Sequence, residues 1–241
     1  MLKTIAMWSG PRNISTAMMR AFENREDTCV SDEPLYAHYL NETGLEHPGA
    51  AEVIASQEND WGELASTLTS PPVTGHHVWY QKHMTHHLLP ERDIGWVRDL
   101  TNCFLIRDPA EVLSSYTRTR GEATLNDLGY PQQLALFRQV EAWTGSTPPV
   151  LDARDVLKSP DRLLGLLCDH LGIEMHSSML SWPSGPRETD GVWGKYWYEN
   201  VWRSTGFQPY EQKPITFELQ FQTVEEQARP IYEELAQYRL I

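Results

Sequence analysis

The first side chains that could bind an anion stand near the N-terminus, in the stretch SGPRNIST. Arg12 offers a cation, and Ser15 and Thr16 offer hydroxyls, between the apolar run 5–8 and apolar positions at helical spacing. A loop that enters a helix presents free backbone N–H groups and the positive end of the helix dipole. We therefore interpret it as a phosphate-binding loop, with an ordinary strand-to-helix turn as the alternative. The candidates are Gly10, Pro11, Arg12, Asn13, Ile14, Ser15 and Thr16, with Asn13 or Ser15 as the helix cap.

A second arginine and a serine stand in the stretch NCFLIRDPAEVLSSY. The apolar run 103–106 predicts a buried strand, and Asp108 followed by Pro109 is typical of a helix start. Arg107 ends the strand, and Ser115 follows eight residues later, about two turns into the helix. The arginine fork and the serine hydroxyl can therefore converge on one phosphate, the alternative being a salt-bridged arginine and a packed serine.

A carboxylate, Glu33, comes directly after the strand candidate 29–31. In open parallel sheets, ligands bind at the carboxyl ends of the strands. Glu33 is therefore placed where it could meet a ligand. Alternatively, Asp32 and Glu33 cap the helix that Pro34 can open.

Histidines are concentrated around a strand predicted over 77–82. A zinc site needs three or four convergent ligands, and neither a Cys-x-x-Cys pair nor a His-Glu-x-x-His motif accompanies them. We expect no bound metal. The five clustered histidines are at positions 76, 77, 83, 86 and 87.

The elements that must position these groups alternate along the chain. Short apolar strand candidates alternate with amphipathic segments such as 131–143, 159–171 and 217–238. This pattern predicts a single α/β domain over 1–241, a three-layer sandwich with a mainly parallel central sheet. The final third differs, because residues 176–210 are rich in tryptophan and tyrosine.

Composition excludes several classes of protein. A formal net charge of −13 disfavours binding to nucleic acid and to anionic membranes. No apolar run approaches the roughly 20 residues of a membrane-spanning helix, and no signal peptide is recognisable, so we expect a cytoplasmic protein. Three cysteines far apart argue against a disulfide framework. The pattern says nothing of the oligomeric state.

Both arginine motifs resemble those of sulfotransferases that use 3′-phosphoadenosine-5′-phosphosulfate (PAPS). SGPRNIST is similar to their phosphosulfate-binding loop at four positions, and it departs from the usual pattern at Asn13 and Ile14. Glycine is usual where Ile14 stands, and isoleucine adopts a positive φ only with strain. RDPAEVLSSY closely resembles the family's motif for the nucleotide 3′-phosphate, with matches at Arg107 and Ser115.

The resemblance implies a P-loop NTPase-like fold and a sulfotransferase reaction. In that reaction a sulfuryl group passes from PAPS to a hydroxyl or amine of a small-molecule acceptor. Arg12 and the loop amides would hold the 5′-phosphosulfate, and Arg107 with Ser115 the 3′-phosphate. Lys82 would contact the bridging oxygen, and Glu33 or a nearby histidine, His83 first among them, would take the acceptor proton.

The resemblance extends to the aromatic segment, and it leaves two rival functions open. GVWGKYWYENVWRSTGF is similar to the family's C-terminal lid, with Lys195, Arg203, Ser204 and Thr205 as candidates there. A nucleotide-dependent kinase is the first rival, although the Gly-Lys-[Ser/Thr] loop ending of such enzymes is absent. A non-catalytic nucleotide-binding homologue is the second.

Overall fold

The computed structural model describes residues 2–70, 72 and 75–241. In that part of the chain, one five-stranded sheet has the order β2-β3-β1-β4-β5, and all its neighbouring strands run parallel. β1 is the central strand. The strands are β1 Lys3–Ser9, β2 Thr28–Asp32, β3 Val78–Met84, β4 Thr101–Ile106 and β5 Val150–Asp152.

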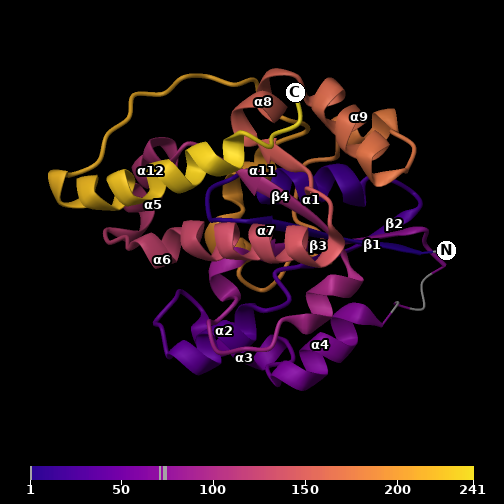
Figure 1. Ribbon diagram of the computed structural model, residues 1–241, viewed down its shortest axis with the longest axis horizontal. Coiled ribbons are helices and arrows are strands. Elements are labelled where there is room, and N and C mark those ends of the chain that lie inside the picture. Colours follow the sequence, from indigo (N-terminus) through magenta and orange to yellow (C-terminus); the bar gives the residue numbers. More distant parts are fainter. Residues whose placement is uncertain (1, 71, 73–74) are drawn as a thin grey trace.

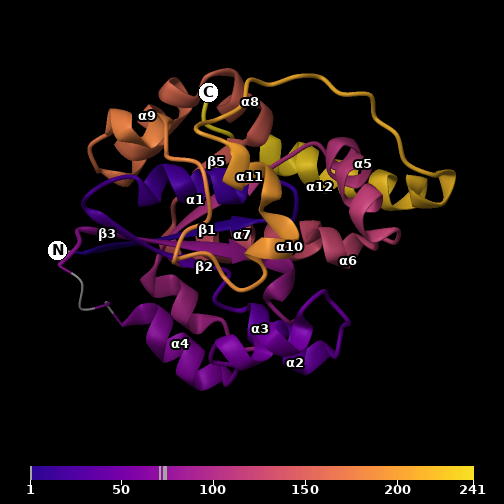
Figure 2. The same ribbon diagram turned by 180° about the vertical axis from the view of Figure 1, so that it is seen from behind.

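Both faces of the sheet are covered by helices. In Figures 1 and 2, α8 and α9 lie above the strands, and α3 and α4 lie below them. The helices are α1 Ser15–Glu23, α2 Tyr36–Thr43, α3 Ala50–Ser56, α4 Trp61–Thr69, α5 Pro109–Arg120, α6 Leu125–Leu128, α7 Tyr130–Thr144, α8 Ala153–Lys158, α9 Pro160–Leu171, α10 Gly194–Trp197, α11 Glu199–Arg203 and α12 Gln222–Ala236. Short 3₁₀ turns are η1 Thr85–His87, η2 Gly95–Asp99, η3 Ser177–Leu180 and η4 Leu219–Phe221.

The layers follow from the alternation of side chains along the strands. In β1, Ile5 and Met7 face a core built with α1, α8 and α9, whereas Ala6 and Trp8 face a core built with α4, α7 and α12. All four side chains are fully buried. A strand with two buried faces is a near-continuous apolar run, as the sequence of β1 is. The predicted three-layer α/β sandwich around a parallel sheet is confirmed.

Element boundaries differ from the predictions at several places, among them β3, which runs to Met84 rather than ending at 82. The terminal helix α12 begins at Gln222 rather than 217, after an extended segment over 207–218. It continues through Pro230, whose exposed position lets solvent bind the carbonyl that the proline leaves without a partner. The cap of α1 is neither Asn13 nor Ser15 but Ile14, and no side chain caps this helix.

The sheet brings the strand ends of distant segments to one edge. The register pairs Asp32 of β2 with Lys82 of β3, and Ser9 of β1 with Met84 of β3. The residues that follow β1, β2 and β4 therefore leave the sheet on the same side. That edge is where open parallel sheets bind their ligands.

Candidate active site

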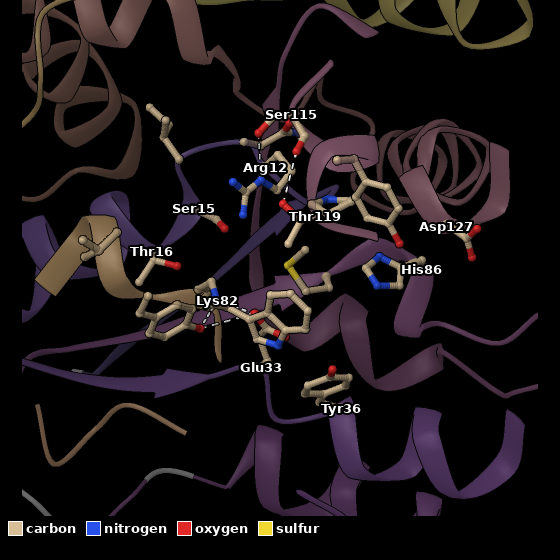
Figure 3. Close-up of a pocket in the computed structure, with 18 of the residues that line it drawn as sticks. Arg12, Ser15, Thr16, Glu33, Tyr36, Lys82, His86, Ser115, Thr119 and Asp127 are labelled. Atoms are coloured by element: carbon tan, nitrogen blue, oxygen red, sulfur yellow. Dashed lines mark hydrogen bonds and ion pairs between the residues drawn. The ribbon is translucent and has the colours of Figure 1, made fainter. Parts of the chain in front are cut away.

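A cavity of about 280 Å³ lies at the carboxyl ends of the strands (Figure 3). We call it the first cavity. Ten of the residues predicted from the sequence line it: Pro11, Arg12, Asn13, Ile14, Ser15, Thr16, Glu33, Lys82, Arg107 and Ser115. Two predicted residues, Gly10 and His83, do not. The chain thus gathers side chains from four separate segments around one space.

The N-terminus of α1 opens toward this cavity. Ile14 is the N-cap, with φ 56° and ψ 15°, and no side chain accepts from the first amides of the helix. Ser15 and Thr16 begin the helix and line the cavity, so the first-turn N–H groups lie at its wall. Uncapped amides at a helix N-terminus favour an anion.

The loop holds a left-handed conformation without a glycine. Arg12 has φ 62° and Ile14 has φ 56°. Such a conformation costs about 1–3 kcal/mol in a residue other than glycine. The side chain of Ile14 packs against the core shared by α1 and the sheet, and this contact offsets part of the cost. The departure from the family's glycine therefore leaves the left-handed turn in place.

Gly10 is needed for packing rather than for the cavity wall. A Cβ atom at this position would lie 2.4 Å from the carbonyl oxygen of Leu128, the last residue of α6. Only glycine allows the loop backbone to approach that helix so closely.

Two arginines and a serine are linked directly. Arg107 Nη1 donates to the carbonyl oxygen of Arg12 at 2.7 Å, and Arg12 Nε donates to Ser115 Oγ at 2.9 Å. Glu111 accepts from Arg107 Nε at 2.9 Å and orients its fork. Burial lowers the pKa of Arg12, and the charges of Arg107 and Arg118 lower it further. Cations held this close repel each other, and a bound polyanion would relieve that repulsion.

Lys82 is buried in a cluster of three oxygen acceptors. Its Nζ donates to Asp32 Oδ1 at 2.8 Å, to Glu33 Oε1 at 2.5 Å and to the Tyr198 hydroxyl at 2.6 Å. Burial opposes the charge, but Asp32 and Glu33 outweigh it and raise the pKa of Lys82. Lys82 is therefore a fixed ammonium at the cavity wall. The sheet register places Asp32 beside it, and Tyr198 arrives from the aromatic segment.

Glu33 has an unusual backbone and an unusual charge environment. Its φ is 40°, and its carboxylate lines the cavity. Burial raises the pKa of Glu33 and the neighbouring Asp32 adds to this, although Lys82 opposes both. A carboxylate that ionises above its usual range is a stronger base, which suits it to accept a proton.

The prediction that His83 lies at the site beside Lys82 is wrong, because of the geometry of β3. Successive side chains of a strand point to opposite faces, so His83 points away from Lys82. It stacks on Trp8, with ring centroids 4.2 Å apart, and its Nε2 bonds to Gln81. The histidines that line the cavity are His86 and His87, which come after β3, and His47, which lies between α2 and α3.

The comparisons with known proteins agree with this geometry. A family model described as "Sulfotransferase domain" matches residues 2–237. This chain belongs to the sulfotransferase domain family. Two Arabidopsis thaliana proteins named branched-chain-amino-acid aminotransferase-like protein 2 and 1 are 31% and 32% identical to it, over 96% and 95% of the chain. The matches cover 41% of each plant protein, so this sulfotransferase-family chain spans about two fifths of their length.

Solved sulfotransferase domains share the fold. The sulfotransferase domain of the curacin biosynthetic pathway matches with a TM-score of 0.51 and 15% identity, covering 94% of this chain and 97% of that domain. The sulfotransferase domain of the Synechococcus olefin synthase matches with a TM-score of 0.54 and 17% identity, covering 94% of each. The P-loop NTPase-like fold implied by the sequence is therefore confirmed.

A second cavity of about 450 Å³ adjoins the arginine cluster of this sulfotransferase-family protein. Arg12, Arg107 and Ser115 line both cavities. The outer wall of the second cavity is formed by the 207–218 segment, including Tyr210, whose hydroxyl donates to Glu111 at 2.7 Å. The arginine cluster thus stands between two adjacent spaces.

The aromatic segment contributes other residues than those predicted. Lys195 pairs with Glu52, and Arg203 pairs with Glu199 at the surface. Neither these two nor Ser204 and Thr205 line either cavity. The segment instead supplies Trp197, Tyr198, Asn200 and Val201. Their side chains are aromatic, amide or aliphatic, so a search for basic residues misses them.

Two further findings concern metals and membranes. In the described ranges, no group of three or more His, Cys, Asp or Glu side chains is arranged to hold a metal ion. Within those same ranges, each helix is too short or too polar to cross a bilayer.

Proposed function

We propose that this protein transfers a sulfuryl group from PAPS to a hydroxyl or amine of a small-molecule acceptor. The observation that carries the proposal is the linked cluster of Arg12, Arg107 and Ser115 beside the uncapped start of α1. A protein with a net charge of −13 that holds arginines against each other is suited to a polyanion. Membership of the sulfotransferase domain family supports PAPS as that polyanion.

The two adjoining cavities suggest how donor and acceptor divide the space. Arg12 and the first amides of α1 would hold the 5′-phosphosulfate, and Arg107 with Ser115 the 3′-phosphate. The nucleoside would then extend into the second cavity, under the 207–218 segment. The first cavity, with Lys82 and Glu33 in its wall, would hold the phosphosulfate end of the donor and, next to it, the acceptor.

Sulfuryl transfer resembles phosphoryl transfer in what it needs from a protein, namely in-line positioning and stabilisation of developing charge. Lys82 would donate to the bridging oxygen as the sulfuryl group leaves. It now donates to three acceptors, so one contact must give way, and two of them, Glu33 and Tyr198, share the cavity wall with it. Glu33 is the one that we propose to be released, because burial already disfavours its carboxylate. A Glu33 carboxylate released in this way can take the proton from the hydroxyl or amine of the acceptor.

Glu33 is a stronger candidate for the base than a histidine. Burial lowers the pKa of His86 to about 3, and His47 and Arg120 contribute. An imidazole with that pKa holds a proton poorly. Glu33 has its pKa raised instead, and it lies within hydrogen-bond distance of Lys82.

A ligand screen by thermal shift separates the proposal from its two rivals. If the protein binds adenosine 3′,5′-bisphosphate, the ligand at about 100 times its dissociation constant raises the free energy of unfolding by about 2.7 kcal/mol. This corresponds to an increase of roughly 5–10 °C in unfolding temperature. We expect this shift with the bisphosphate and none with magnesium-ATP. Stabilisation by magnesium-ATP alone favours a kinase, and an unchanged temperature with both ligands favours a scaffold that binds neither. A non-catalytic nucleotide-binding homologue would be stabilised by the bisphosphate but would not release it from PAPS, so a turnover assay completes the separation.

Arg107→Ala is expected to weaken binding of the bisphosphate roughly 10- to 100-fold, because a hydrogen bond to a charged group contributes about 1.5–3 kcal/mol. Binding of adenosine 5′-phosphosulfate, which has no 3′-phosphate, should change much less. Calorimetry measures both. Arg138→Ala is a matched control, since Arg138 pairs with Glu234 on the surface. Equal losses for the two ligands would remove Arg107 from recognition of the 3′-phosphate.

A further inference from the structure

Arg120 is a cation in the first cavity that lacks a carboxylate partner. It is the last residue of α5, and its guanidinium carbon lies 4.7 Å from the ring centroid of Trp197 and 6.0 Å from that of Tyr116. In the described part of the chain, no carboxylate oxygen lies within 4.0 Å of its nitrogens. Two aromatic rings therefore hold this guanidinium while its hydrogen-bond donors stay available.

The other arginines of the cavity wall are engaged differently. Arg12 donates to Ser115, and Arg107 donates to Glu111 and to a carbonyl. These contacts orient both side chains at the boundary with the second cavity. Arg120 lines the first cavity only, so it is separate from the cluster assigned to the donor. A half-buried guanidinium gains most from an anion that can accept two parallel hydrogen bonds.

The surroundings of Arg120 are mostly aromatic, with one carboxylate, Asp127, in the same cavity wall. His47 and His86 are both neutral near pH 7, because burial, reinforced by Arg120, lowers the pKa of His47 to about 4 and that of His86 to about 3. Asp127, on the same side of the cavity as His86 in Figure 3, is occupied by the capping box with Thr124. The remaining walls include the rings of Tyr36, Tyr39, Tyr116 and Trp197, whose flat faces suit a planar guest.

Arg120 is close enough to the proposed reaction centre for one small molecule to reach both. Both groups act on the pKa of Tyr36. Burial raises this pKa most, Glu33 raises it further, and Arg120 lowers it. Its side chain lies at the cavity wall near Glu33 and Lys82 in Figure 3. A cavity of about 280 Å³ admits a compact molecule and no polymer segment of appreciable length.

We propose that the acceptor is a small planar hydroxyl compound that carries a carboxylate, and that Arg120 binds this carboxylate while the hydroxyl meets Glu33 and Lys82. The role of this compound as the acceptor rests on the proposed function. The binding of a carboxylate by Arg120 does not depend on it. Arg120 would then determine specificity by rejecting analogues that lack the negative charge.

Three phenols test the proposal by calorimetry, with and without saturating adenosine 3′,5′-bisphosphate. They are 4-hydroxyphenylacetate, its neutral amide 4-hydroxyphenylacetamide, and the cationic tyramine. The wild type should bind the acid roughly 10- to 100-fold more tightly than the amide, as expected for a charge-assisted bond of about 1.5–3 kcal/mol. Arg120→Gln should reduce that preference to about twofold or less. Arg120→Lys, which keeps the charge but not the fork, should retain part of it.

Arg98→Gln is the matched control, because Arg98 also lies over a tryptophan, Trp143, but outside both cavities. It should leave the preference for the acid unchanged. Equal binding of acid and amide, preference for tyramine, or no binding of the acid at millimolar concentration would each overturn the assignment of Arg120. If the bisphosphate fails to bind while the acid is still preferred, the proposed donor is wrong and the anion site stands.

Discussion

Lys82→Ala is expected to lower kcat by about 10²- to 10³-fold, the loss typical of one donor that stabilises charge in a transition state. The affinity for adenosine 3′,5′-bisphosphate should change little, because in the proposed reaction the oxygen that Lys82 would contact gains its charge only as the sulfuryl group leaves. Release of the bisphosphate from PAPS measures turnover, and calorimetry measures binding. A variant that turns over normally would exclude Lys82 from the mechanism.

The controls must separate chemistry from folding. Removing Lys82 leaves the buried Asp32 carboxylate without its cation, and breaking such a pair costs about 3–5 kcal/mol. Lys82→Met combined with Asp32→Asn removes both charges and should restore much of the stability without restoring turnover. Lys195→Ala is a matched lysine control, since Lys195 pairs with Glu52 on the surface. It should leave kcat unchanged.

Glu33→Gln is expected to slow turnover by about 10²- to 10⁴-fold, the range of a lost general base. The same change should raise the unfolding temperature at pH 8. Burial and Asp32 disfavour the Glu33 carboxylate in the folded protein, and glutamine is never charged. An increase of roughly 2–4 °C would correspond to about 1 kcal/mol.

The pH dependence of this stability gain has a defined sign. The folded pKa of Glu33 is raised above its ordinary value of 4.5, so the folded protein holds this proton more tightly than the unfolded chain. The contribution of Glu33 to the stability of the wild type therefore falls as pH rises from about 4.5 through the raised pKa, and then levels off. The difference in free energy of unfolding between Glu33→Gln and the wild type should grow over that pH range. A constant difference from pH 4 to 9, or a less stable variant, would contradict the electrostatic environment described for Glu33.

The sequence predicted the residues of the arginine cluster. Arg12, Arg107 and Ser115 belong to two strand-to-helix junctions, and in a parallel sheet such junctions share one edge. Topology indicated that the two junctions share an edge, and the resemblance to the sulfotransferase motifs selected these residues within them. The cost of Ile14 was also foreseeable, because backbone sterics depend on residue type alone. What the pattern could not supply is the core contact of Ile14 that offsets this cost.

The surroundings of Lys82 and the rest of the first cavity depended on information that no local pattern contains. His83 is adjacent to Lys82 in sequence, but the two-residue period of a strand sends it to the other face. Predicting this would have required the exact residue at which β3 ends. Tyr198 and Arg120 line the cavity through long-range contacts, Tyr198 with Lys82 of β3 and Arg120 with the ring of Trp197. An arginine at a helix end reads from sequence as an ordinary surface charge.

The hydrogen bond between Tyr198 and Lys82 has a consequence for how the protein is made. These residues are 116 positions apart, and Tyr198 also donates to Asp32, 166 positions away. A ribosome adds roughly 5–20 residues per second, so the partners of Lys82 from β2 are available many seconds before the phenol that completes its environment. Nascent chains that end before Tyr198 should therefore hold a buried ammonium with one hydrogen-bond acceptor missing, and the region around Lys82 should become resistant to proteolysis only once translation has passed α11.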